Sequence, residues 1–129
     1  MILDTDMLIA LMQGKKDAYK AMQDLEEKNA RVATTIISAY ELFKGADVSS
    51  RPERNLTKIQ DLLSNIEILE LTLQATHEAS VLYREMMKTG RLMGEFDLLI
   101  AAIAKVNGET ILTRDKHFKC VKGLELADW

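Results

Sequence analysis

The 129-residue chain has few of the residues that mark several protein classes. It has one cysteine, Cys120, so no disulfide can form within the chain, and nothing implies an oxidising compartment. One proline and six glycines are too few for a linker-like or disordered chain. The longest uncharged apolar run covers residues 98–104, which is too short to cross a bilayer. These absences exclude disulfide-stapled, disordered and membrane-spanning classes.

The features that are present indicate an ordinary globular protein. Hydrophobic residues make up 47% of the chain and charged residues 29%, and the length predicts a single domain over residues 1–129. The N-terminal apolar stretch carries Asp4 and Asp6 and has no basic flank, so it does not resemble a signal peptide. We therefore expect a cytoplasmic protein.

The net charge of −3 disfavours a protein that binds nucleic acid through a broad basic surface. Lys44, Arg91, Arg114 and Lys116 flank acidic motifs and could contact phosphates, although solvated surface is the more ordinary role for each of them. Charge alone therefore does not exclude a nuclease.

Short apolar segments alternate with amphipathic ones along the chain. The segments 31–36, 67–71 and 110–113 predict strands, 124–126 is a candidate for a last one, and 1–3 is either a strand or a helix start. Apolar residues at helical spacing predict helices near 8–14, 18–25, 38–45, 56–66, 72–89 and 97–107. A loop is expected at 49–55, and Tyr83 is expected on the buried face of the helix 72–89. This alternation predicts an α/β fold, a three-layer α/β/α sandwich around a short central parallel sheet.

Four acidic residues lie where such a fold binds its ligands. Parallel sheets bind ligands beyond the carboxyl ends of their strands. Asp4 follows the segment 1–3, and Asp115 follows the strand 110–113. Asp97 begins a helix after a glycine-rich loop, and Glu41 lies in the helix after the strand 31–36. The sequence therefore predicts that these carboxylates share one end of the sheet.

Each acidic residue also has an ordinary structural explanation. Asp97 and Asp115 could simply cap a helix or a turn. That explanation is weaker for Asp4, which interrupts an apolar run, and for Glu41, which shares a helical row with Ile37. Buried carboxylates are costly unless they are paired or bound to metal.

Converging carboxylates repel one another, and a hard divalent cation relieves that repulsion. Oxygen ligands favour Mg²⁺ or Mn²⁺, and one cysteine with two distant histidines, His77 and His117, gives no zinc-like spacing. Metal held by carboxylates can activate water and stabilise the charge that develops on a phosphodiester. The residues therefore favour metal-dependent phosphodiester hydrolysis over acyl transfer.

Four ordered segments carry a resemblance that spans Ile2 to Phe118. LDTDMLIALM, ISAYELFKGA, GEFDLLIAAIAKVNG and ILTRDKHF resemble the PIN-domain ribonucleases, and most of all the VapC toxins of toxin–antitoxin pairs. The resemblance implies a PIN-like fold and one or two Mg²⁺ or Mn²⁺ ions bound by an acidic quartet. That quartet corresponds to Asp4, Glu41, Asp97 and Asp115.

The resemblance also implies supporting residues, a substrate and partners. Thr5 and Thr113 would hold the acidic site by hydrogen bonds. The substrate would be RNA, with transfer or ribosomal RNA plausible, and the partners would be a small antitoxin and a second copy of the chain in a homodimer. An apolar stripe is expected to be mainly core, with an antitoxin groove as the alternative; its residues are Leu8, Leu11, Met12, Leu56, Ile59 and Leu63.

One departure and two alternatives stay open. The family commonly has asparagine after Asp-Thr, where this chain has Asp6, so Asp6 is either a tolerated variant or a supporting carboxylate. A PIN fold that binds RNA or protein without cleaving it is one alternative. The other is a haloacid-dehalogenase-type phosphatase with Asp4 as the nucleophile, although Lys105 and Asp115 are poor substitutes for its remaining motifs.

Overall fold

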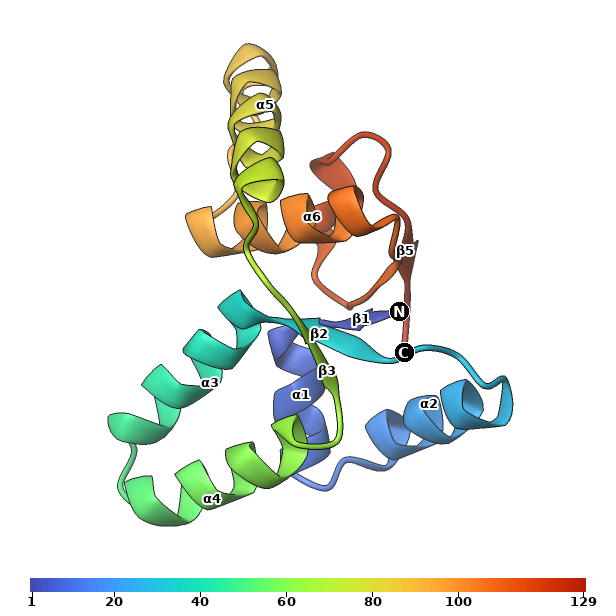
Figure 1. The fold of residues 1–129 in the computed structure, drawn as a ribbon, viewed down its shortest axis with the longest axis vertical. Helices are drawn as coiled ribbons and strands as arrows, with labels where there is room; N and C mark the ends of the chain where they lie inside the picture. The colour runs from blue at the N-terminus through green and yellow to red at the C-terminus, as the bar shows by residue number, and fades with distance from the viewer.

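The computed structural model describes all 129 residues and contains six α-helices and a five-stranded parallel sheet (Figure 1). The elements follow one another as β1 (Ile2–Leu3), α1 (Thr5–Met12), α2 (Lys16–Glu27), β2 (Ala33–Thr35), α3 (Ile36–Asp47), α4 (Pro52–Leu63), β3 (Glu67–Leu69), α5 (Leu73–Thr89), α6 (Glu95–Asn107), β4 (Ile111–Leu112), the short 3₁₀ helix η1 (Lys116–Cys120) and β5 (Leu126–Ala127).

The strands are arranged in the order β3-β2-β1-β4-β5. The chain leaves the central strand β1 toward β2 and β3 on one side, and later returns to form β4 and β5 on the other. Ile2 pairs with both Ala33 of β2 and Ile111 of β4, so β1 lies where the direction of winding reverses. Such a reversal opens a crevice at the carboxyl ends of the strands, where α/β proteins bind ligands.

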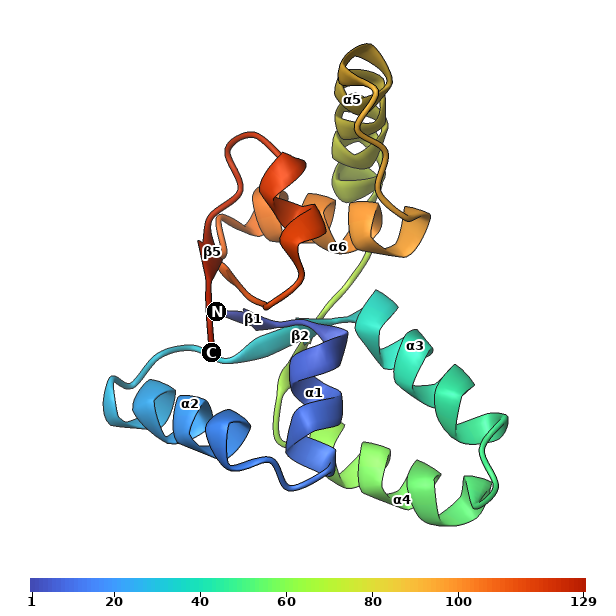
Figure 2. The same cartoon turned by 180° about the vertical axis from the view of Figure 1, so that it is seen from behind.

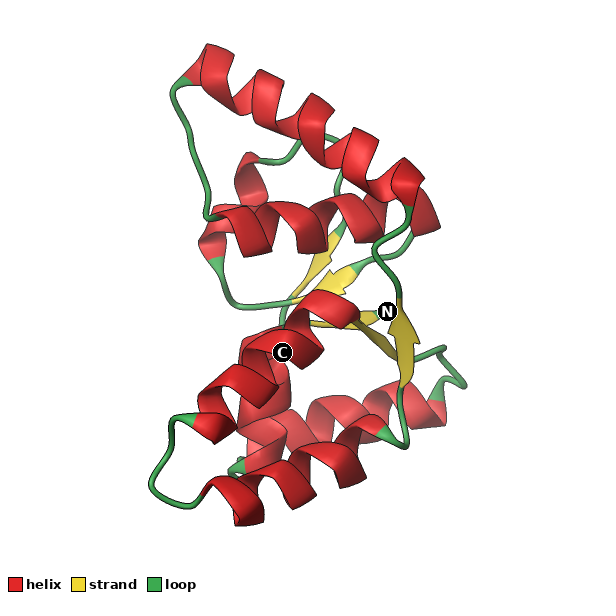
Figure 3. Cartoon of the chain, turned by 60° about the vertical axis from the view of Figure 1, so that its left-hand side comes forward, coloured by secondary structure: helices red, strands yellow, loops and turns green.

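Helices cover both faces of the sheet, with α5, α6 and η1 on one side and α1 to α4 on the other (Figure 2 and Figure 3). Alternation along the strands creates the two cores. Ile2 and Ile111 are buried in the α5–α6 core, and the next residues, Leu3 and Leu112, are buried in the α1–α4 core. The predicted three-layer sandwich with a short parallel sheet is therefore confirmed.

The elements differ from the sequence prediction mainly at their ends. The predicted strand 31–36 is shorter because Thr35 caps a helix that begins at Ile36; its hydroxyl accepts a hydrogen bond from the Ser38 amide at 3.1 Å. The predicted loop 49–55 is also shorter, because Pro52 begins α4 in the position that suits its fixed φ. The segment at 1–3 is a strand, and the last strand lies at Leu126–Ala127 rather than at 124–126.

The apolar faces of the helices are mostly where the spacing placed them. Leu8, Leu11, Ile59 and Leu63 are buried, which confirms the core interpretation for most of that stripe. The prediction for Tyr83 was wrong: its side chain is 46% exposed, because α5 packs mainly against α6 and leaves its outer face open. None of the helices combines the length and the apolarity needed to cross a bilayer.

Candidate active site

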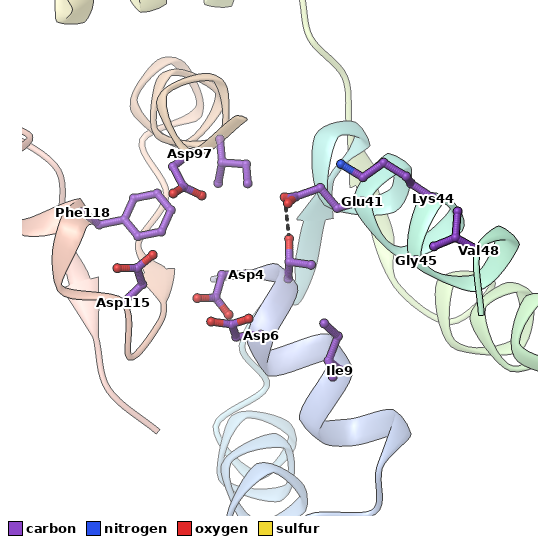
Figure 4. A pocket seen from close by; sticks show the side chains of 12 residues that line it. Asp4, Asp6, Ile9, Glu41, Lys44, Gly45, Val48, Asp97, Asp115 and Phe118 are labelled. Carbon is purple, nitrogen blue, oxygen red and sulfur yellow. Dashed lines mark hydrogen bonds between the residues drawn. The ribbon is translucent and has the colours of Figure 1, made fainter. Parts of the chain in front are cut away.

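A pocket of about 470 Å³ opens at the reversal of the sheet, beyond the ends of β1 and β4 (Figure 4). All four acidic residues predicted from the sequence line it, and Asp6 adds a fifth carboxylate. Figure 4 shows that these side chains come from four separate parts of the chain and point toward a shared space. The complete lining is Asp4, Thr5, Asp6, Ile9, Glu41, Lys44, Gly45, Val48, Asp97, Ile100, Asp115 and Phe118.

Asp4 is held at the end of β1 as the N-cap of α1. Its Oδ1 accepts a hydrogen bond from the Met7 amide at 2.8 Å, and the residue is only 3% exposed. Burial raises the pKa of the Asp4 carboxyl to about 6, against the opposing effects of hydrogen bonds from Thr113 and Met7. The charges of Asp6 and Asp115 raise it further. The capping role of Asp4 was not predicted from the sequence.

Glu41 lies on α3 and is joined to α1 by Thr5. The Thr5 hydroxyl donates a hydrogen bond to Oε1 of Glu41 at 2.9 Å, which leaves the other carboxylate oxygen facing the pocket without a protein donor. A hydrogen bond from Thr5 was expected to support the acidic site, and the structure contains it.

Asp97 lies in the first turn of α6, where Gly94 rather than Asp97 is the N-cap. Its carboxylate makes no hydrogen bond or ion pair with the protein, so capping does not explain this residue. Desolvation raises the pKa of Asp97, and the nearby negative charges of Asp115 and Glu41 raise it further. Asp97 is thus an unpaired carboxylate that faces other carboxylates across the pocket.

Asp115 caps η1, as one interpretation of the sequence allowed. Its Oδ1 accepts a hydrogen bond from the His117 amide at 2.9 Å and lies 2.7 Å from Nδ1 of the same imidazole. The Thr113 hydroxyl in turn accepts a hydrogen bond from the Asp115 amide at 2.9 Å. Thr113 therefore fixes the turn that carries Asp115 from β4 into the pocket, and sequence reasoning did not anticipate the contact with His117.

The donor set fits a hard divalent cation by its chemistry. Every charged oxygen in the pocket belongs to a carboxylate, and no cysteine or histidine lines it. In the observed rotamers, no three His, Cys, Asp or Glu side chains are close enough to hold one ion together. Mg²⁺ commonly keeps several waters and is bound through only one or two carboxylates, so this spacing accommodates a hydrated ion.

Apolar residues complete the pocket, and the sequence analysis did not single them out. Phe118 and Ile100 are almost fully buried beneath it, while Ile9 and Val48 are exposed at its edge. Burial of Phe118 and Ile100 in the core of α5 and α6 makes that side of the pocket rigid and lowers the local polarity. Their apolar character is typical of any core, so no sequence signal distinguishes them.

Gly45 is the lining residue whose small size leaves the pocket open. It lies within α3, and a Cβ added at this position would meet no atom within 4 Å. We therefore expect Gly45→Ala to raise the free energy of unfolding by about 0.5–1 kcal/mol, because alanine is the better helix former and fits the space. Urea unfolding of the wild-type and Gly45→Ala proteins measures this difference. A lower free energy of unfolding for Gly45→Ala would contradict the expectation, because it would mean that another group occupies the space next to Gly45 in solution.

The chain is similar to known proteins over nearly its full length. The model of the PIN domain matches residues 1–124. The tRNA(fMet)-specific endonuclease VapC of Shigella flexneri is 30% identical, over 99% of this chain and 96% of that protein. Ribonuclease VapC2 of Rickettsia felis is 31% identical, with the same coverage.

Solved structures agree with these sequence matches. The structure of VapBC2 from Rickettsia felis bound to a DNA fragment from its promoter contains a chain with a TM-score of 0.92 and 29% identity, covering 99% of this chain and 97% of that one. DNA-bound VapBC from Salmonella typhimurium gives a TM-score of 0.91 at 27% identity, covering 99% and 96% of the two chains. The chain therefore belongs to the PIN-domain family, and within it to the VapC ribonucleases.

Proposed function

We propose that this chain is a metal-dependent endoribonuclease toxin whose pocket binds one or two Mg²⁺ or Mn²⁺ ions. Asp4, Glu41, Asp97 and Asp115 would be the ligands, some of them through water molecules in the hydration shell of an ion. The observation that supports this most is the presence of these four carboxylates, from separate segments, in one pocket where Asp97 has no protein partner. Repulsion among them is relieved when a cation is bound.

The bound ions would supply activated water and a positive charge opposite the phosphodiester. The chain's own residues would hold this site in shape. Thr5 orients Glu41 by its hydrogen bond, and Thr113 fixes the turn before Asp115. Asp6 is exposed at the pocket without a hydrogen bond, which fits a supporting carboxylate that contacts the hydration shell of an ion. Residues that orient ligands in this way tune metal affinity.

Transfer RNA is the substrate class that we infer, because a VapC relative is named for a tRNA-specific endonuclease. Such a substrate would place the enzyme in the cytoplasm.

The alternative of a haloacid-dehalogenase-type phosphatase is excluded by the match to the PIN domain. The homodimer implied by the resemblance stays a prediction that light scattering can test.

The antitoxin would bind along a groove that starts at the acidic pocket. A neighbouring hollow shares Ile9, Glu41 and Gly45 with that pocket, and a third shares Met12 and Lys58 with the second. The three hollows thus follow one another over α1, α3 and α4 toward α2. Similar chains are solved as VapBC complexes, and an antitoxin segment along these hollows would reach the carboxylates and block them.

Cleavage of total RNA with Mg²⁺, with Mn²⁺ or with excess chelator tests the proposal. We expect discrete fragments with either metal and none with chelator, and sequencing of the fragment ends would identify the RNA. Protein carrying Asp97→Asn, purified in the same way, controls for contaminating ribonuclease. Cleavage that persists in chelator would contradict the metal-dependent mechanism. If total RNA from the source organism is not cleaved with either metal, the alternative of a PIN fold that binds RNA or protein without cleaving it would be favoured.

A further inference from the structure

Two aromatic residues lie beside the acidic pocket, next to its lining residue Lys44. Tyr40 directly precedes Glu41 on α3, and Phe96 directly precedes Asp97 on α6. Their ring centroids are 5.5 Å apart and the ring planes are 80° apart, which is an edge-to-face contact. Phe96 also lines a smaller hollow together with Glu41 and Asp97, so both rings lie next to the pocket although neither lines it.

Lys44 lies over both rings. Its Nζ is 5.4 Å from the centroid of Tyr40 and 4.9 Å from that of Phe96, within the range of a cation–π interaction. Lys44 is the only basic residue that lines the pocket, and it forms no ion pair although five carboxylates line the same pocket. Figure 4 shows Lys44 and Glu41 projecting from the same helix, across the opening from Asp97. The two rings thus hold the Lys44 ammonium, which has no carboxylate partner, at the edge of the pocket.

Packing within the protein does not explain these aromatic residues. Tyr40 is 51% exposed, and neither Tyr40 nor Phe96 belongs to the two hydrophobic cores. The exposed part of the Tyr40 ring is open to a ligand, and covering it would remove apolar surface from water. A polyanionic substrate also needs a positive group near a pocket whose own charge repels it.

We propose that Tyr40, Phe96 and Lys44 form a nucleotide clamp, in which the base next to the scissile phosphodiester stacks on Tyr40 and its phosphate contacts Lys44. This proposal rests on the proposed ribonuclease function and extends it to substrate recognition. Unpaired bases that are displayed by loops and ends stack on aromatic side chains, whereas paired bases within a helix cannot. The clamp therefore selects single-stranded RNA, such as a tRNA loop, and tolerates different bases because every base has a π-face.

Binding measured without cleavage tests the clamp. The protein carries Asp97→Asn with Mg²⁺ present, and the probes are a fluorescein-labelled oligoadenylate 12-mer and an abasic ribose-phosphate strand of equal length. We expect Tyr40→Ala to weaken oligoadenylate binding roughly 5- to 150-fold, because stacking of one base contributes about 1–3 kcal/mol. Tyr40→Phe keeps the ring and should keep the affinity. The abasic strand should bind equally well to all three proteins.

Two further variants separate the contributions of the ring and the charge. Lys44→Gln should weaken binding of both strands and reduce the salt dependence by about one ion, as expected for one phosphate contact. Tyr83→Ala removes another exposed tyrosine, on α5 and outside the pocket, and should change nothing.

Three outcomes would overturn the clamp: no binding of oligoadenylate, equal losses for oligoadenylate and abasic strands in Tyr40→Ala, or unchanged oligoadenylate affinity in that variant. The last result, together with weaker antitoxin binding, would assign this edge of the pocket to the protein partner instead. The proposed nuclease function fails separately, through absence of RNA cleavage by wild-type protein, because the binding assay requires no cleavage.

Discussion

Replacing Asp97 by asparagine is expected to slow RNA cleavage roughly a thousandfold while the protein stays folded, because several kcal/mol of metal-derived stabilisation of the transition state would be lost. Asp97 makes no hydrogen bond with the protein, so its charge has no structural task that asparagine would fail to perform. The substitution also removes a charge that Asp115 and Glu41 repel. Initial cleavage rates with saturating Mn²⁺, together with circular dichroism, measure the two effects.

Glu95→Gln is the matched control for this experiment. Glu95 lies in the same first turn of α6 and is exposed, but it does not line the main pocket. Both substitutions remove one negative charge next to the helix N-terminus and so have the same effect on the helix dipole. Equal losses of activity in the two variants would mean that the charge of the helix end matters, and not ligation by Asp97.

The sequence was sufficient to predict the layers and the acidic residues of the pocket, for a physical reason. Strands in a parallel sheet end on one side, so Asp4 and Asp115 were expected at the same edge once their strands were recognised. The structure adds that β1 and β4 are neighbours, which brings the two residues close together. Glu41 and Asp97 were less constrained, since each lies in a helix whose direction depends on packing. The resemblance in the segments ISAYELFKGA and GEFDLLIAAIAKVNG supplied what spacing alone could not.

Other features depend on tertiary contacts that no local pattern encodes. The helical spacing placed Tyr83 on a buried face, but whether that face is covered depends on where α6 lies. The predicted strand 31–36 extended one residue too far at its end. Ile36 is β-branched and suits a strand locally, whereas in the structure the Thr35 cap begins a helix at Ile36. The contact between Tyr40 and Phe96 joins residues 56 positions apart in sequence, and only the fold brings them together.

The second large expected effect is that of Asp4 on the free energy of unfolding. Its pKa of about 6 in the folded protein exceeds the ordinary value of 3.8, so the folded state binds more protons than the unfolded state between these two values. The free energy of unfolding therefore falls as pH rises through this window. Above pH 6 the ionised carboxylate lowers it by up to about 3 kcal/mol in the absence of metal.

We therefore expect Asp4→Asn to inactivate the enzyme and yet make the metal-free protein up to about 3 kcal/mol more stable at pH 7. Asparagine can still accept the hydrogen bond from the Met7 amide, so the N-cap of α1 is retained. Urea unfolding in chelator from pH 4 to pH 7 should show the gain at pH 7 and its disappearance near pH 4. Asp24→Asn, which removes an exposed carboxylate on α2 outside the pocket, is the control and should change the free energy of unfolding little. A gain that persisted at pH 4 would point to the shape or hydrogen bonding of the amide, because the carboxyl is then protonated and neutral. A gain confined to neutral pH would mean that the pocket retains a carboxylate at a cost in stability, as expected of a group kept for the chemistry it performs.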